Sequence, residues 1–338
     1  MSGLSDFAAK FDKELGHEEP EMGIRTWLST GFAPLDHAIS GKFTGGGMPV
    51  GRIVEIFGPS SCGKTAIATK VMAEAQKAGG FAMFMDHERS FDPRLGRQLG
   101  LNTDRGPFFH ELPDTFEASM TYAIKTAKRA REEKIIPATA PIVIVFDSLA
   151  AMVPKSKFAK EIDEQGMNDS LALAKATSAV FPALALYAEK FQMLVLVLNQ
   201  MRLKPGVVYG PPETTPGGEA PRYYASVRIQ LGAKKLMEGE GDAKEMIGQE
   251  ITAKCIKNKV SRPFQVAKWG FKFREDGSGY FDVEGSMLDY LIDEKLIPAA
   301  GARVTWTDGK SYYRKALTQK IASEGLLPEL LAMLPSPT

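Results

Sequence analysis

Four short apolar runs recur in the chain, at residues 52–57, 81–85, 141–146 and 191–198. Continuous runs of this length are typical of strands that are buried on both faces of a sheet. Helix-prone stretches separate them, at residues 66–78, 116–133 and 171–189. This alternation predicts an α/β fold with a mostly parallel, twisted sheet flanked by helices. Parallel connections bring the carboxyl ends of the strands to one edge, where such folds bind ligands.

The segment after the first run, Gly58 to Thr65, reads GPSSCGKT and matches the phosphate-loop pattern G-x-x-x-x-G-K-T between a strand and a helix. Backbone N–H groups of such a loop and the start of the following helix cradle phosphates. Lys64 supplies a mobile cation and Thr65 a hydroxyl for Mg²⁺. The sequence therefore predicts binding of a nucleoside triphosphate through Gly58, Pro59, Ser60, Ser61, Cys62, Gly63, Lys64 and Thr65.

Polar residues follow the other three predicted strands at the same edge. Asp147 ends the third strand beside the phosphate loop, which is the position of a carboxylate that holds Mg²⁺. Hydrolysis also needs a carboxylate near the attacking water, and both Asp86 and Glu88 follow the second strand. Spacing alone does not choose between these two. Gln200 follows the fourth strand, and its amide suits sensing of the γ-phosphate.

A long irregular segment comes next. Residues 201–218 contain four prolines and four glycines, which excludes a helix or a central strand. A loop of this length in a compact domain is usually functional or disordered. It carries Arg202, Lys204 and Tyr209, cations and an aromatic ring that suit contact with a nucleic-acid backbone and bases. A second loop, at residues 157–169, is mixed in charge, and its composition indicates only a solvated loop.

Composition sets the limits of these interpretations. The 338 residues are 44% hydrophobic and 25% charged, which is typical of a soluble protein with one large core and a smaller appendage. No apolar stretch approaches the ~20 residues of a membrane span, and the N-terminal residues lack a secretory pattern. We therefore expect a cytoplasmic protein with no membrane partner. The net charge of +1 means that nucleic-acid binding would depend on local patches.

Cysteine and histidine point to no further chemistry. The two cysteines, Cys62 and Cys255, give no disulfide framework, and the four histidines are scattered without metal-ligand spacing. Cys62 lies in the phosphate loop near a helix start, which favours a lowered pKa, although a small filler residue is the more ordinary interpretation.

Several separated segments, taken in order, resemble the bacterial RecA-type recombinase family. They are LSTGFAPLDHAISG, GGGMPVGRIVEIFGPSSCGKT, FMDHERSFDP, VIVFDSLAAMVPK, LNQMRLKPGVVYGPPETTPGGEAPRYYASVR and IKNKVSRPF. The resemblance extends from about Ile24 to about Leu331 and suits a divergent or bacteriophage-encoded member. It implies an ATP- and Mg²⁺-dependent protein that forms helical filaments of its own copies on single-stranded DNA and pairs that strand with homologous double-stranded DNA.

The resemblance also implies a role for each matching residue. Lys64, Glu88 and Gln200 become the catalytic residues, with Glu88 as the general base for water and Asp86 as a supporting residue. Lys257 and Lys259 match cations that reach the ATP of the adjacent subunit. The remaining implied contacts are Asp92 and Asp147 for nucleotide, with Thr65 and Asp147 for the metal; Met167, Lys175, Met201, Arg202, Lys204, Tyr209, Gly217 and Gly218 for DNA; and Phe7, Phe11, Arg222 and Tyr223 for neighbouring subunits.

Three domains are expected on the same grounds. Residues 1–23 form an oligomerisation helix and linker, because apolar residues from Leu4 to Leu15 make one helical stripe. Residues 24–276 form a RecA-like phosphate-loop ATPase core. Residues 277–338 form a small α+β domain that gathers duplex DNA, with a helix at 285–297, a hairpin around Asp308 and Gly309, and a last helix from about Arg314.

The chain departs from the family pattern at a few positions. Ala172 and Ala179 stand where the family carries arginines, and Leu95 stands where the family stacks a tyrosine on adenine. Glu219 follows Gly217 and Gly218, placing an acid close to the expected path of DNA. Single-strand contacts and base selectivity can therefore differ from those of relatives.

Two other functions share parts of this pattern. A ring helicase or DNA motor has the same core and a shared nucleotide site, but typically places an arginine finger, rather than a Lys257–Lys259 pair, across the interface. A regulatory nucleotide-binding module would not explain both the 201–218 loop and a complete set of hydrolytic residues. A DNA-dependent ATPase that acts as a recombinase accounts for all of these features.

Overall fold

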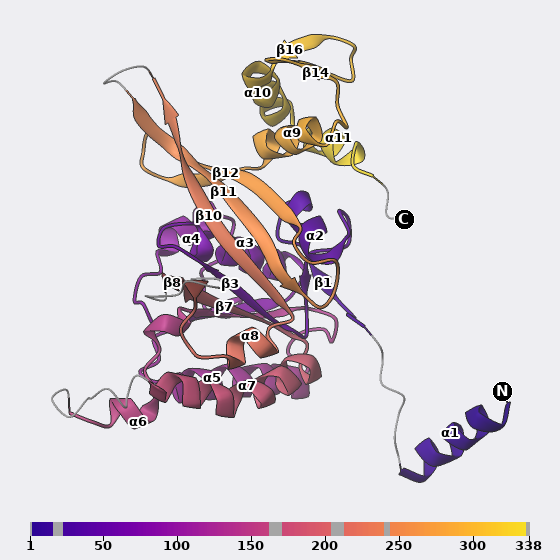
Figure 1. The fold of residues 1–338 in the computed structure, drawn as a ribbon, viewed down its shortest axis with the longest axis vertical. Coiled ribbons are helices and arrows are strands. Elements are labelled where there is room, and N and C mark those ends of the chain that lie inside the picture. Colours follow the sequence, from indigo (N-terminus) through magenta and orange to yellow (C-terminus); the bar gives the residue numbers. More distant parts are fainter. Residues whose placement is uncertain (1, 16–22, 162–170, 204–212, 240–243, 336–338) are drawn as a thin grey trace.

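The computed structural model describes residues 2–15, 23–161, 171–203, 213–239 and 244–335. A nine-stranded sheet forms the centre of the molecule (Figure 1), in the order β13-β12-β11-β10-β3-β7-β6-β4-β5. Its strands are β3 Ile53–Gly58, β4 Phe81–Asp86, β5 Phe108–Glu111, β6 Ile142–Asp147, β7 Met193–Gln200, β10 Val227–Glu238, β11 Glu245–Asn258, β12 Val266–Phe273 and β13 Gly279–Asp282. The pairs from β10 to β5 are parallel and those from β10 to β13 are antiparallel. The predicted mostly parallel α/β sheet is confirmed.

Helices cover both faces of the parallel strands, which explains their continuous apolar sequences. In β6, Val143 and Val145 pack on the side of α3, whereas Ile144 and Phe146 pack on the side of α5 and α7. Figure 1 shows α3 on one side of the sheet and α5, α7 and α8 on the other. The helices of this part are α2 Ala33–Ser40, α3 Lys64–Lys77, α4 Pro93–Gln98, α5 Phe116–Glu132, η1 Leu149–Ala151, α6 Lys155–Phe158, α7 Ala172–Lys190 and α8 Ala220–Tyr224.

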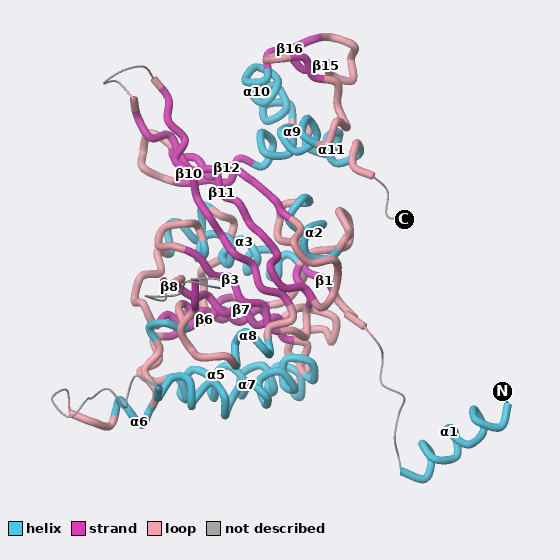
Figure 2. The backbone as a smooth tube through the Cα atoms, in the orientation of Figure 1, coloured by secondary structure: helices cyan, strands magenta, loops and turns pink. Residues whose placement is uncertain are grey.

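The pattern of apolar runs does not predict β5 or the antiparallel strands β10 to β13. β5 is an edge strand and β10 to β13 form one end of the sheet, and these strands are buried on one face at most over much of their length. Charged residues therefore alternate with apolar ones, and no continuous run marks them. The strands β10 and β11 pair along nearly their whole length and extend as a long ribbon beyond the body (Figure 2).

Two short ribbons and a C-terminal unit complete the fold. β1 Trp27–Leu28 pairs with β2 Met48–Pro49, and β8 Arg202–Leu203 pairs with β9 Glu213–Thr214. The C-terminal unit contains α9 Val283–Asp293, β14 Ala299–Ala300, β15 Arg303–Thr305, β16 Ser311–Tyr313, α10 Arg314–Glu324 and α11 Leu327–Ala332. The expected hairpin is the β15–β16 pair. The expected helix at 285–297 is shifted, because Asp282 caps its start and Lys295, with a φ of 58°, lies past its end.

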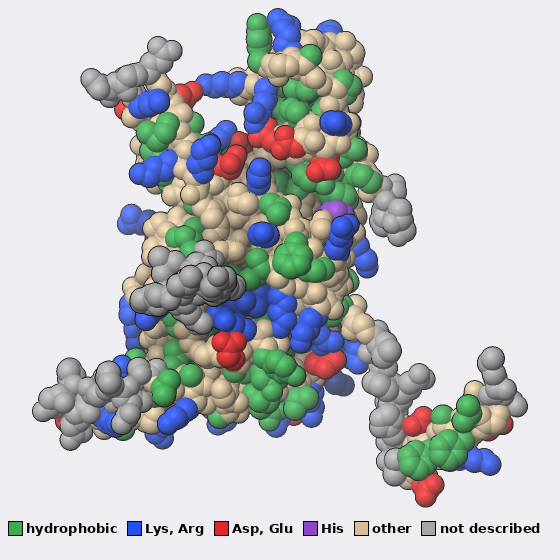
Figure 3. Space-filling model, in the orientation of Figure 1, with side chains coloured by type: hydrophobic (Ala, Val, Ile, Leu, Met, Phe, Trp, Pro, Cys, Tyr) green, Lys and Arg blue, Asp and Glu red, His purple; other side chains and the backbone are tan. Residues whose placement is uncertain are grey.

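The first helix, α1 Ser2–Leu15, stands apart from the body in Figure 1. The side chains of Leu4, Phe7 and Phe11 are 80%, 63% and 49% exposed, and they form an apolar stripe that is visible in Figure 3. Most of the expected linker that follows lies outside the described residues. Among the described helices, none has the length and apolar character needed to cross a membrane.

Candidate nucleotide and nucleic-acid site

The phosphate loop joins β3 to α3 in a conformation that depends on glycine. Gly63 precedes α3 with a φ of 87°, and a Cβ atom there would lie 2.7 Å from Cδ1 of Ile251 on β11. At Gly58, a Cβ atom would lie 2.4 Å from the carbonyl oxygen of Leu231 on β10. The antiparallel ribbon thus packs directly against the loop, and larger residues at either position would push the two apart.

Lys64 and Thr65 take up positions suited to phosphate and cation. The Lys64 ammonium donates hydrogen bonds to the carbonyl oxygens of Pro59 at 2.7 Å and Gly58 at 3.3 Å. The Thr65 hydroxyl donates to Oδ2 of Asp147 at 2.7 Å. Burial raises the pKa of Asp147 to about 6, against the lowering effect of the Thr65 hydrogen bond. A hydroxyl and a carboxylate oxygen side by side fit Mg²⁺, which uses one or two carboxylates together with substrate phosphates.

The geometry separates the two carboxylates that the sequence left open. Glu88 accepts hydrogen bonds through Oε1 from the Ser148 hydroxyl and, at 3.0 Å, from Nε2 of Gln200. It thereby connects the ends of β4, β6 and β7.

Asp86 instead serves the turn after β4. It is 1% exposed and accepts from the backbone N–H groups of Ser90 and Phe91 at 3.2 and 3.1 Å. His110 on β5 lies 3.2 Å from its Oδ2 atom. Of the two carboxylates, Glu88 is thus the one linked to Gln200 and Ser148.

Both described ends of the 201–218 loop are attached at this edge of the sheet. The N–H of Met201 donates to the carbonyl of Gly58 at 3.2 Å, and Nδ2 of Asn199 donates to the carbonyl of Pro216 at 3.0 Å. Gly217 and Gly218 have φ values of 95° and 71° and pack against Leu149 and Ala174. The β8–β9 pair closes the base of the loop. Arg202 there is exposed, as is Lys175 near the start of α7, whereas Met167, Lys204 and Tyr209 lie outside the described residues.

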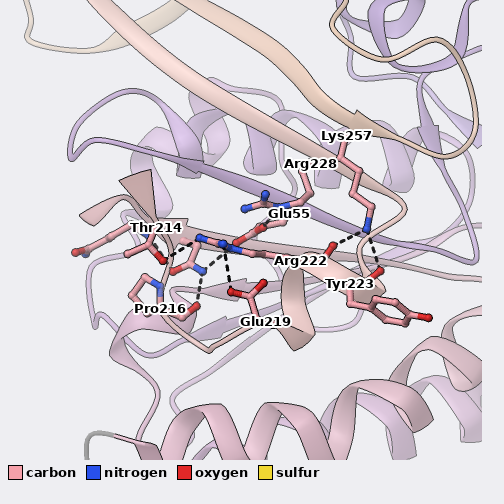
Figure 4. Close-up of polar contacts among 10 residues, drawn as sticks. Glu55, Thr214, Pro216, Glu219, Arg222, Tyr223, Arg228 and Lys257 are labelled. Carbon is pink, nitrogen blue, oxygen red and sulfur yellow. Dashed lines mark hydrogen bonds and ion pairs between the residues drawn. The ribbon is translucent and has the colours of Figure 1, made fainter. Parts of the chain in front are cut away.

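The expected interface residues form a second cluster, drawn in Figure 4. The Lys257 ammonium donates to the carbonyl oxygens of Arg222 and Tyr223, and Lys259 lies 5.4 Å from the centre of the Tyr223 ring. Partial burial, together with Lys259 and Arg228, lowers the pKa of Lys257 to about 8. The Arg222 guanidinium contacts Thr214 and Glu219 of its own chain. Tyr223 is 68% exposed.

Two residues expected at the nucleotide have local structural roles. The Asp92 carboxylate caps α4 by accepting from the N–H of Arg94. Cys62 is 1% exposed in the core, and burial raises the pKa of its thiol, which does not favour a reactive cysteine.

Sequence reasoning missed several residues that link these clusters. They are Ser148, Thr177, Asn199, Glu55 and Arg228. Ser148 and Asn199 stand beside predicted site residues, and Glu55 is the one acid inside a predicted buried strand. These were available signals. Thr177 and Arg228 carry no comparable mark in the sequence.

Comparisons with known proteins agree with this arrangement. Residues 6–277 match the family model described as RecA N-terminal domain. The chain is 39% identical over 285 residues to the chromosomal protein RecA of Lactococcus lactis subsp. lactis (strain IL1403), covering 84% of this chain and 68% of that protein. It is 36% identical over 320 residues to protein RecA of Clostridium novyi (strain NT), covering 91% and 83%.

Proposed function

The chain belongs to the RecA family of recombinases, and from that membership we propose that it forms a helical filament on single-stranded DNA, pairs the strand with homologous duplex DNA and promotes strand exchange, with DNA-stimulated ATP hydrolysis. One observation carries the proposal beyond family membership. The loop proposed to bind DNA begins with a hydrogen bond from Met201 to Gly58 of the phosphate loop. The two segments are therefore joined directly by a backbone hydrogen bond.

The proposed chemistry uses the residues at the strand ends. The loop from Gly58 to Gly63 and Lys64 bind the phosphates of ATP, and Thr65 and Asp147 hold Mg²⁺. Mg²⁺ bound there would neutralise negative charge on the phosphates. Glu88 accepts a proton from the attacking water, while Ser148 and Gln200 fix the direction of its carboxylate through their hydrogen bonds.

Assembly is proposed to complete the nucleotide site. Lys257 and Lys259 extend from the same ribbon that packs on the phosphate loop, and we assign them to the ATP of a neighbouring copy. Partial burial weakens protonation of Lys257, so a phosphate nearby would favour its charged form. Phe7 and Phe11 on α1 dock on a neighbour, and Arg222 and Tyr223 also contact neighbouring subunits.

The remaining assignments follow from the family. DNA contacts come from Lys175, Met201, Arg202, Gly217 and Gly218, and from Met167, Lys204 and Tyr209 outside the described residues. Asp92 is also assigned to the nucleotide. The domain boundaries are placed at 23/24 and 276/277, with the C-terminal domain gathering duplex DNA. The protein acts in the cytoplasm.

Joint-molecule formation tests this function. A labelled single strand and homologous supercoiled duplex are mixed with the protein and either ATP or a non-hydrolysable analogue. Homology-dependent joints under both conditions are expected, because the ATP-bound filament carries out pairing. A heterologous duplex is the matched control. DNA-stimulated hydrolysis without joints under either condition would overturn the recombinase and favour a DNA motor.

A further inference from the structure

Glu55 is a fully buried carboxylate on an otherwise apolar part of the sheet. It lies in the middle of β3, is 0% exposed, and stands three positions before Gly58, the first residue of the phosphate loop. Its neighbour on the same face, Ile53, belongs to the apolar core beneath α5 and α7. A buried carboxylate is costly unless it is paired and hydrogen-bonded, so its partners indicate what it does.

Arg228 on β10 supplies the counter-charge. Arg228 and Glu55 are register partners in the parallel β3–β10 pair, and Nε of Arg228 donates to Oε2 of Glu55. The Arg228 side chain is 11% exposed, and its guanidinium lies 4.7 Å from the centre of the Phe57 ring. The pair therefore fixes one carboxylate oxygen and leaves Oε1 to accept from elsewhere.

Asn199 on β7 uses that second oxygen. Its Nδ2 donates to Oε1 of Glu55 at 3.0 Å and to the carbonyl of Pro216 at 3.0 Å, while its Oδ1 accepts from the N–H of Gln200 at 3.0 Å. All of these contacts come from one side-chain amide, which is 0% exposed. Figure 4 shows Glu55 between Arg228 and the end of the loop near Pro216.

All three partners agree on which way this amide faces. The carboxylate of Glu55 and the carbonyl of Pro216 only accept hydrogen bonds, and the N–H of Gln200 only donates, so Asn199 turns its NH₂ group toward Glu55 and Pro216 and its oxygen toward Gln200. A neutral amide at position 55 could present its own NH₂ group to Asn199, and one N–H of this buried amide would then lose its acceptor. The fixed position of Asn199, and with it the link between Gln200 and Pro216, therefore depends on the carboxylate acceptor that Arg228 holds in place.

The returning end of the loop is held on its other side as well. The Thr177 hydroxyl on α7 donates to the carbonyl of Gly217 at 2.7 Å. A Cβ atom at Gly217 would lie 2.7 Å from Cδ2 of Leu149, so this part of the backbone is closely packed. Pro216 and Gly217 thus have fixed hydrogen-bond partners on β7 and α7. A shift of Gln200 reaches them through a single side chain.

We propose that Glu55 and Arg228 are positioning residues that couple the nucleotide site to the DNA-binding loop, by holding Asn199 as a rigid link between Gln200 and Pro216. This inference rests on the proposed function. Neither residue is among those assigned to nucleotide or DNA. In the native chain, ATP would raise the affinity for single-stranded DNA, and DNA would raise the affinity for ATP by the same factor. Glu55 and Arg228 would act on that coupling factor.

The test measures that factor in two directions. The dissociation constant of a fluorescein-labelled oligothymidylate is measured with and without a non-hydrolysable ATP analogue, and that of a fluorescent ATP analogue with and without oligothymidylate. Coupling factors of about 5–150-fold are typical of linked sites, and we expect one in this range for the native chain. In Glu55→Gln the factor is expected to fall to within about 2-fold of one, with nucleotide affinity in the absence of DNA retained.

A second variant separates coupling from folding, because Glu55→Gln leaves Arg228 buried without its counter-charge. The double variant Glu55→Gln/Arg228→Met removes both charges together, which is far better tolerated than removing one. It is expected to keep the native Tm and still lose the coupling. Glu189→Gln is the matched control, because it breaks the Arg52–Glu189 ion pair just before β3 and should leave the coupling intact.

The outcomes distinguish the two levels of the argument. Loss of coupling in both directions in the folded double variant supports the inference. A native coupling factor in the folded double variant overturns it and leaves the proposed function standing. A factor of one in the native chain overturns the proposed function itself, since ATP and DNA would then be independent ligands.

Discussion

Replacing Glu88 by glutamine gives the sharpest test of the proposed chemistry. Both donors to Glu88, Ser148 and Gln200, use the single oxygen Oε1. The carbonyl oxygen of a glutamine accepts both bonds, so the fold and the nucleotide site are retained. What disappears is the capacity to accept a proton from water. General-base catalysis contributes about 10²–10⁴-fold, equivalent to about 2.7–5.4 kcal/mol of barrier.

The assay is steady-state phosphate release at saturating ATP and single-stranded DNA. We expect kcat of Glu88→Gln to fall by about 10²–10⁴-fold, while light scattering still reports ATP-dependent assembly on DNA. The Tm should change little, because no buried group loses a partner. Assembly without hydrolysis would accumulate ATP-bound filaments.

Asp86→Asn is the matched control, since it alters the other carboxylate at the end of β4. Asparagine offers one acceptor oxygen where Asp86 now meets Ser90, Phe91 and His110. An unsatisfied buried donor costs about 1–3 kcal/mol, so the Tm should fall while kcat of the folded protein is retained. Native hydrolysis by Glu88→Gln, or a larger loss of kcat in folded Asp86→Asn, would refute the assignment of Glu88 as the base.

Three further predictions follow from other parts of the molecule. Lys64→Ala removes the cation of the phosphate loop. A charged hydrogen bond contributes ~1.5–3 kcal/mol, so the affinity for an ATP analogue should fall by about 10–150-fold and nucleotide-dependent assembly should be lost. Native affinity in a fluorescence titration would contradict this prediction. The double variant Phe7→Ser/Phe11→Ser should abolish assembly in sedimentation experiments. Its Tm should not fall, because both side chains are exposed. Lys13→Ala, at an exposed position of the same helix, should leave assembly intact. Burial, opposed by hydrogen bonds from Ser29 and Thr30, raises the pKa of Asp36 from 3.8 to about 7, so its stabilising contribution is complete below pH 3.8 and is lost as the pH rises through 7. The measurement is the free energy of unfolding in urea of the native chain minus that of Asp36→Asn. This difference should decline between pH 4.5 and 8, by up to about 1.4 kcal/mol per pH unit. A difference that does not change with pH would show that Asp36 is not buried as described.

The parallel half of the fold could be predicted because burial on both faces leaves a simple mark in the sequence. The strands β4, β6 and β7 are apolar until their polar ends, β3 is apolar apart from Glu55, and parallel topology brings the strand ends together. The antiparallel half has no such mark, since its strands mix charges with apolar residues. The ribbon that packs on Gly58 and Gly63 was therefore missed.

The candidate site was predictable where chemistry is local and unpredictable where it depends on distant partners. Asp86 and Glu88 follow the same strand, and only the turn to Ser90 and Phe91 shows that Asp86 is occupied. Glu55 is conspicuous in its strand, but Arg228 lies 173 residues further along the chain. No local pattern connects them. The roles carried over from the family for DNA and subunit contacts stay predictions.

The strand β11 serves two places at once. Ile251 packs on Gly63 of the phosphate loop, and Lys257, six positions later in the chain, is the cation assigned to a neighbouring copy. At about 3.3 Å per residue, a single strand, with a bulge at Ile256, spans the roughly 20 Å between them. In the proposed filament, β11 would then connect two successive ATP sites. Hydrolysis of one ATP would change the rate of hydrolysis at the next site, so hydrolysis would proceed in order along the filament rather than at random.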